Sequence, residues 1–77
     1  MLDILEPRPL LAERLIRCQR TRRYWSPEGW TDEPEAATVF GDAYDAVRTC
    51  VEEDLKDVEL VLQMPDTKAE LFVTRLR

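Results

Sequence analysis

Residues 23–40 constrain the fold most, because they hold both tryptophans of the chain together with two signals that interrupt regular structure. Residues 26–29 read Ser-Pro-Glu-Gly, and proline at the second position with glycine at the fourth is typical of a tight turn. Residues 32–35 predict a short helical turn, with Asp32 as its N-cap and Glu35 completing a capping box. This segment excludes one long element and predicts short elements fixed by aromatic packing.

The stretch before this segment has two interpretations. Apolar and polar residues alternate over 16–19, as in a half-buried strand, but residues 10–20 are also rich in helix formers. We favour a strand over residues 15–20 that turns at Thr21 and Arg22 into a second strand over 23–25. Cys18 would then lie opposite Trp25, although this turn lacks the glycine that two-residue hairpins prefer.

The main helix is predicted over residues 43–54. Asp42 is a good N-cap, and acidic residues near the C-terminal end should make that end fray. Val39 and Phe40 are expected to point inward before the helix begins. Apolar residues recur at helical spacing along one face: Ala43, Ala46, Val47, Cys50 and Val51.

The C-terminal part predicts a β-hairpin, with strands over 58–64 and 69–76 and a turn over 65–68. A turn of this length places Leu62 opposite Leu71 and Leu60 opposite Val73 on the core face. Val61 and Phe72 would share the other face, where an apolar pair needs a cover. Either the N-terminal segment or a partner would supply that cover.

These elements predict an α+β domain with the order β-β-α-β-β. Two β-hairpins, one at each end of the domain, form a small antiparallel sheet, and the main helix packs on one face of it. Residues 1–12 are predicted to be an N-terminal extension and residues 13–77 a single domain. A chain of 77 residues builds only a small core, so a partner subunit would add to its stability.

The pattern over residues 16–51 resembles that of short uncharacterised bacterial proteins, which carry Y-L-S-x-x-G-W-T-x5-A-x-x-F followed by a helix. The resemblance implies a strand before the pattern and no known activity. The chain departs from the pattern at Arg22, where a hairpin glycine is expected, and at Trp25, where a smaller apolar residue is usual. The matching positions are Tyr24, Ser26, Gly29, Trp30, Thr31, Ala37 and Phe40.

The composition argues against catalysis. Without histidine, neither a Ser-His nor a Cys-His nucleophile pair can form, and without a CxxC motif a zinc site is not expected. Asp32, Glu33 and Glu35 are better explained as helix-start and surface residues than as a Mg²⁺ site. We therefore expect no enzyme activity, no metal and no cofactor. Cys18 and Cys50 are expected to be thiols, and the absence of a signal-like or membrane-spanning segment predicts a small acidic cytoplasmic protein.

Charge is unevenly distributed, and the basic part is the first candidate site. Residues 1–25 carry six arginines, whereas residues 26–59 carry eleven acidic residues against Arg48 and Lys56. The basic hairpin could bind single-stranded nucleic acid through cations and stacking rings. Alternatively, its arginines pair with the acidic helix and lie over aromatic rings, which suits the net charge of −5 better. The basic hairpin's candidate residues are Arg17, Arg20, Arg22, Arg23, Tyr24 and Trp25, and Arg17 is expected on the exposed side.

The preferred hypothesis is a non-enzymatic protein–protein interaction module that self-associates through its sheet edges, as a homodimer. Val61 and Phe72 join the candidate contacts, because pairing at an edge would cover them. Tyr24 and Trp25 must point to opposite faces of a strand, so one of the two is expected to be exposed and to serve as an interface anchor. Single-stranded nucleic-acid binding is the alternative function, and no membrane partner is expected.

Overall fold

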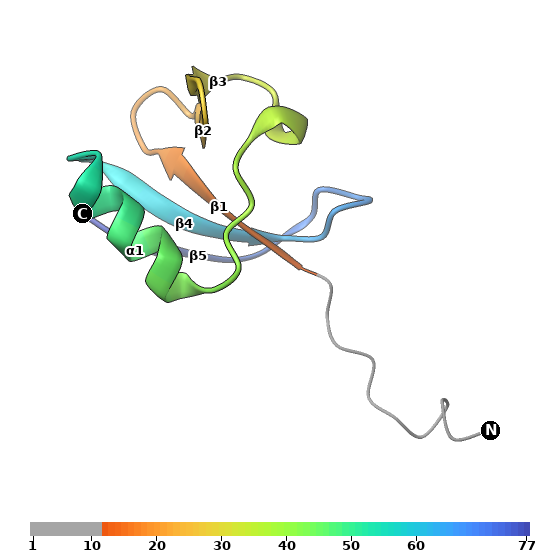
Figure 1. Ribbon diagram of the computed structural model, residues 1–77. Coiled ribbons are helices and arrows are strands. Elements are labelled where there is room, and N and C mark those ends of the chain that lie inside the picture. The colour runs from red at the N-terminus through yellow and green to blue at the C-terminus, as the bar shows by residue number, and fades with distance from the viewer. Residues whose placement is uncertain (1–11) are drawn as a thin grey trace.

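The computed structural model describes residues 12–77, which form one antiparallel five-stranded sheet and one α-helix (Figure 1). The strand order is β3-β2-β1-β4-β5, which confirms the predicted α+β class and adds β3 to the N-terminal hairpin. The extension predicted over residues 1–12 lies, apart from Ala12, outside the described residues. The elements are β1 Glu13–Cys18, β2 Tyr24–Ser26, β3 Gly29–Thr31, the 3₁₀ turn η2 Pro34–Ala36, α1 Ala43–Glu52, β4 Val58–Gln63 and β5 Glu70–Arg75.

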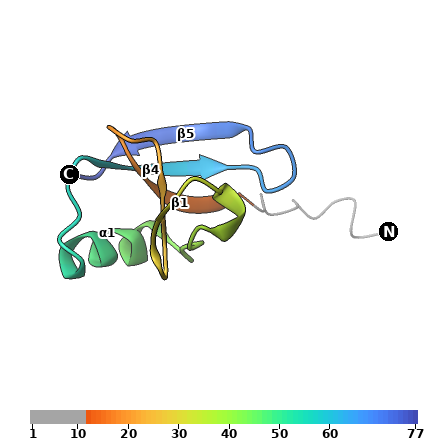
Figure 2. The ribbon, with the colours of Figure 1, turned by 90° about the horizontal axis from the view of Figure 1, so that it is seen from above.

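Strand β1 is the centre of the sheet, with β2 on one side and β4 on the other. Figure 2 shows β1, β4 and β5 running alongside one another, with α1 on the β1 side and the β2–β3 hairpin crossing their direction. The helix lies between β3 and β4 in the chain and returns the backbone so that β4 pairs antiparallel with β1. No helix within residues 12–77 is long and apolar enough to cross a bilayer.

The turn of the first hairpin differs from the prediction. Arg17 lies opposite Tyr24, and the Cys18 amide donates to the Arg23 carbonyl at 2.8 Å. The loop therefore spans residues 19–22, and Cys18 does not lie opposite Trp25. Arg22 adopts a positive φ of 66°, a conformation that glycine adopts without strain.

The core lies between α1 and the β1–β4 pair. Its buried members are Ile16, Phe40, Ala46, Cys50, Leu55, Val58 and Leu60. Of the predicted helix stripe only Ala46 and Cys50 are buried, while Ala43, Val47 and Val51 are exposed. The prediction for Val39 was also wrong. Phe40 bridges to Arg14 in extended backbone, where adjacent side chains point to opposite sides, so Val39 faces outward.

The two predicted helix starts have different outcomes. Asp42 caps α1 as expected, because its Oδ1 accepts the Asp45 amide at 2.9 Å. The capping box at η2 is absent: Glu33 occupies the N-cap position without a side-chain bond, and the Thr31 hydroxyl accepts the Glu33 amide at 3.1 Å. Asp32 pairs instead with Arg23, so its carboxylate is used by an ion pair.

The second hairpin has the expected turn and an unexpected register. Met64 donates its amide to Ala69 at 2.9 Å, which closes the predicted loop over residues 65–68. One pair further, a β-bulge adds a residue to β5, so that Gln63 lies opposite Glu70 but Leu62 lies opposite Phe72. Compared with a hairpin without a bulge, the extra residue moves the side chain of every later residue in β5 to the opposite face of the sheet.

Because of the bulge, the predicted cross-strand pairs were wrong. Leu62 does not lie opposite Leu71, and Leu60 lies opposite Thr74 because Val73 pairs with Val61. Val61 and Phe72 therefore point to opposite faces. Val61 is 0% exposed and Phe72 is 56% exposed, so they do not form the shared apolar face that the sequence predicted.

Candidate interaction site

The basic hairpin is the first candidate, and its central arginine is buried. Arg17 is only 4% exposed, with its Nε 2.6 Å from the Glu59 carboxylate and its Nη1 bonded to Glu70. Its guanidinium also lies 6.0 Å from the centre of the Tyr24 ring. The expectation of an exposed Arg17 with room for phosphate was wrong, because β4 and β5 bring two carboxylates to the face that Arg17 occupies.

Arg17 and Glu70 shift each other's proton affinity. Burial acts to lower the Arg17 pKa, but its hydrogen bonds to Glu70 and Glu59 outweigh burial and raise that pKa above its ordinary value. The hydrogen bond from Arg17 lowers the pKa of Glu70. Both groups are thus held in their charged forms, and the pair ties β1 to β5.

The other hairpin arginines also have carboxylate partners. Arg22 lies 3.2 Å from Glu59, Arg23 lies 3.1 Å from Asp32, and Arg20 lies 3.5 Å from Asp57. The interpretation that these arginines pair within the chain is confirmed. The partners lie on strands and loops, however, and not on the acidic helix as expected. The exposed pairs of Arg20 and Arg23 stabilise little, but all three pairs compete with phosphate for the guanidinium groups.

The depressed Glu70 pKa predicts a loss of stability in acid. A carboxylate whose folded-state pKa is lowered stabilises the fold above its unfolded pKa of about 4.3, and that contribution disappears as the pH falls through the lower, folded value. We expect the free energy of unfolding, measured by urea titration, to fall less steeply below that pH in Glu70→Gln than in the parent chain. Identical slopes in the two proteins would contradict this assignment.

The aromatic residues of this region pack mainly against other parts of the protein. Trp25 packs on the core, and its ring meets Trp30 edge-on, with centroids 5.2 Å apart and planes at 74°. Tyr24 and Trp25 are both half-buried, so neither is the exposed anchor that strand alternation predicted. Trp30 is the more exposed member of the pair, at 37%.

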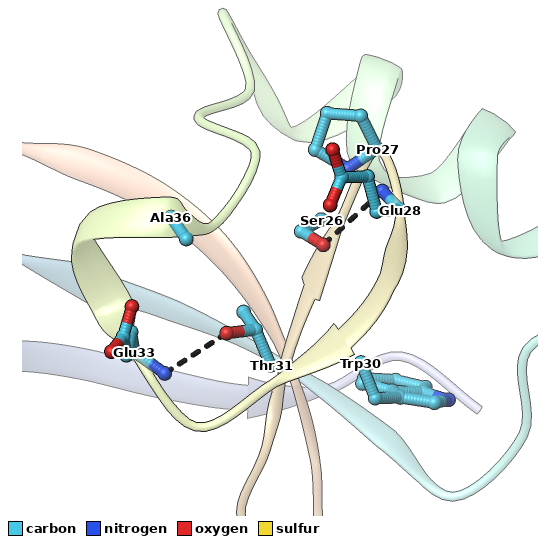
Figure 3. A pocket seen from close by; sticks show the side chains of 7 residues that line it. All are labelled: Ser26, Pro27, Glu28, Trp30, Thr31, Glu33 and Ala36. Atoms are coloured by element: carbon cyan, nitrogen blue, oxygen red, sulfur yellow. Dashed lines mark hydrogen bonds between the residues drawn. The ribbon is translucent and has the colours of Figure 1, made fainter.

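A pocket of about 500 Å³ lies between the β2–β3 hairpin and η2, lined by Ser26, Pro27, Glu28, Trp30, Thr31, Glu33 and Ala36 (Figure 3). Its hydroxyl groups already serve local turns: Ser26 accepts the Glu28 amide and donates to the Gly29 carbonyl, and Thr31 accepts the Glu33 amide. The Trp30 ring lies on the other side of β3 from Glu33. The lining thus presents no set of groups converging on one ligand.

Strand β5 is the stronger candidate, because it is a sheet edge with apolar side chains. Within residues 12–77 it has a strand neighbour, β4, on one side only. Leu71 and Val73 are 47% and 39% exposed, and Phe72 is more exposed than either. The strand lies at the rim of the sheet (Figure 2). Exposed edges of this kind pair readily with another strand.

Some backbone N–H and C=O groups of β5 point away from β4, toward the open edge of the sheet. Leu76 donates its amide to Val58 at 2.9 Å, one position beyond the Glu59–Arg75 pair of the β4–β5 register. Hydrogen-bonded and non-bonded pairs alternate along an antiparallel ladder, so Thr74 and Phe72 also bond to β4. The N–H and C=O groups of Val73 and Arg75 therefore point away from the sheet.

Charges mark the two ends of β5 and are absent between them. Glu70 begins the strand and Arg75 ends it, with no charged residue or proline over residues 71–74. Arg75 donates to the Arg77 carbonyl and has no carboxylate partner among residues 12–77. The opposite edge, β3, is only three residues long. Short edges and edge charges are the usual protections against pairing, and the middle of β5 lacks them.

The remaining predictions concern metals and thiols. Residues 12–77 contain no group of three potential metal ligands placed to hold an ion. Both cysteines have free thiols, and Cys50 is buried while Cys18 is half-buried. Burial raises the Cys50 pKa. At Cys18 burial acts in the same direction, but hydrogen bonds from Thr21 and Arg20 and the charge of Arg20 together outweigh it and lower the pKa. Neither thiol has a histidine partner, because the chain contains no histidine.

Sequence reasoning identified Phe72 but missed Leu71 and Val73. It assigned these two residues to the core face, and the bulge and the position of β5 at the edge leave them exposed. The low charge of residues 71–74 was the available signal.

Comparison with protein-family models, with curated proteins and with solved structures finds no match to this chain.

Proposed function

We propose that the protein is a non-enzymatic interaction module that self-associates by pairing β5 with β5 of a second copy. The outward backbone groups of Val73 and Arg75, flanked by exposed apolar side chains, carry this proposal. A second strand would satisfy those groups and cover Phe72 and Val73 at the same time. We also propose a cytoplasmic location, which the free thiols of both cysteines support.

A second copy is the partner that the charges favour. Two antiparallel β5 strands bring the acidic end of each against the basic end of the other, whereas parallel strands would bring like charges together. A single strand pair gives a small interface, at or below about 1,200 Å² of total buried surface. We therefore expect reversible association, with a dissociation constant in the range of about 1 μM to 1 mM.

The alternative, binding of single-stranded nucleic acid by the basic hairpin, receives less support. All four arginines of that hairpin have carboxylate partners, and Arg17 is buried. With a net charge of −5, the chain lacks the excess of cations on which phosphate binding depends. No contact of the described residues favours it over self-association.

Amide hydrogen exchange tests the proposed function at single residues. In a lone copy the Val73 and Arg75 amides face solvent and should exchange quickly. We expect both to become protected as protein concentration rises, because the second strand accepts their hydrogen bonds. The amides of β3 serve as the internal control and should not change. Unchanged exchange at Val73 up to about 1 mM would remove the proposal, since weaker pairing falls outside the expected range.

A further inference from the structure

We infer that the two copies of Val73 lie directly opposite each other across a two-fold axis. Arg75 of each copy then forms an ion pair with Glu70 of the other. This inference rests on the proposed self-association and adds its register and its charge contacts. It depends on three observations: the outward backbone groups of β5, the position of the bulge, and the faces on which Glu70 and Arg75 lie.

Symmetry limits the possible registers. Joining two sheets edge to edge through antiparallel strands requires a two-fold axis perpendicular to the sheet, because this axis keeps each face on its own side. Residues that lie opposite each other must then point to the same face of the sheet. This requires that one residue at the centre of the pairing lies opposite its own copy in the partner strand. In β5 the two central candidates are Phe72 and Val73.

The bulge selects Val73. With Val73 at the centre, its own N–H and C=O exchange hydrogen bonds with Val73 of the partner subunit, at a regular position of the strand. With Phe72 at the centre, the hydrogen bonds of Val73 itself would go to the partner subunit's Leu71, whereas the Val73 register keeps its central pair of bonds away from that residue. Leu71 is the extra residue of β5, and a bulge disrupts the ladder where it occurs.

The Val73 register brings opposite charges together. Arg75 then lies across from Leu71 of the partner subunit, next to the partner subunit's Glu70. In each copy the backbone of Arg75 lies opposite Glu59 and that of Glu70 lies opposite Gln63, which places Arg75 and Glu70 on the face away from the helix. Arg75 has no carboxylate partner among residues 12–77, and the Glu70 side chain remains 41% exposed while it holds Arg17. The dimer would thus give Glu70 a second cation.

Charge reversal followed by mixing tests these contacts. Arg75→Glu alone and Glu70→Arg alone should each dimerise roughly ten- to thirtyfold more weakly than the parent, because two like-charge contacts replace two ion pairs. Mixed together, the two variants should form a heterodimer of near-parental affinity, seen by native mass spectrometry. Arg48→Glu, on the helix, is the matched control and should leave dimerisation unchanged. A mixture that dimerises no better than its components would overturn the register, provided that both variants keep the parental circular dichroism.

A cross-linking arm covers the case in which Glu70→Arg fails to fold without its Arg17 contact. In a Cys18→Ser, Cys50→Ala background, Val73→Cys should form an intermolecular disulfide, because facing Cα atoms lie about 5.5 Å apart. Phe72→Cys should cross-link more slowly. Faster cross-linking at residue 72 would overturn the Val73 register while leaving self-association in place. A parent chain that stays monomeric would instead remove the proposed function itself.

Discussion

Replacing Glu59 with leucine is expected to lower the free energy of unfolding by about 3 kcal/mol, the low end of what breaking a buried ion pair costs. Arg17 would keep only Glu70 as its carboxylate partner. Arginine cannot relieve the cost by deprotonation, because its guanidinium stays protonated in proteins. The double variant Arg17→Met, Glu59→Leu should recover most of the loss, because it removes the buried charge together with its partner.

Urea unfolding at a protein concentration below the proposed range of association measures this effect. Arg20→Met is the matched control: its pair with Asp57 is exposed and 3.5 Å long, so we expect a change below about 1 kcal/mol. The account of the buried network would be wrong if Glu59→Leu unfolded like the control. It would also be wrong if the double variant were less stable than the single one.

Local patterns predicted most elements of the fold. The strand at residues 58–63 and the Asp42-capped helix depend on neighbours within a few positions, and both are present. Likewise, the alternation over residues 16–19 correctly favoured a strand over a helix. The helix ends at Glu52, two residues before its predicted end, as the acidic residues there suggested.

Register could not be predicted, because one residue decides it. Residues 65–68 form the expected turn, yet the bulge one pair later reversed the facing of Val73 relative to the prediction. Side chains in a strand alternate with a period of two, so a single extra residue converts a core position into a surface position. No local sequence signal in residues 69–76 marked Leu71 as that extra residue.

The burial of Arg17 could not be predicted from the sequence for a different reason. Its partners, Glu59 and Glu70, lie 42 and 53 residues further along the chain, so only the sheet topology brings them together. One signal was present: Glu59 is a charged residue within the apolar strand 58–63. Charged side chains are almost never buried without a partner, so a buried glutamate implies a nearby cation.

Proline at residue 73 is expected to abolish dimerisation and leave the monomer folded. Proline removes the amide of its own residue, and the Val73 amide points away from β4, as edge strands tolerate. Proline at residue 74 is the contrasting control. The Thr74 amide bonds to β4, so Thr74→Pro should lose about 3 kcal/mol or more of folding stability. The pair of variants separates the outer edge of β5 from its inner edge.

Sedimentation velocity of the parent chain and Val73→Pro, from about 10 μM to 1 mM, tests the proposed self-association most directly. We predict that the parent approaches twice the monomer mass as concentration rises. Val73→Pro should stay monomeric at every concentration, with the helix and sheet signals of the parent in circular dichroism. If both chains sediment identically over the whole range, β5 is not the surface through which this protein associates.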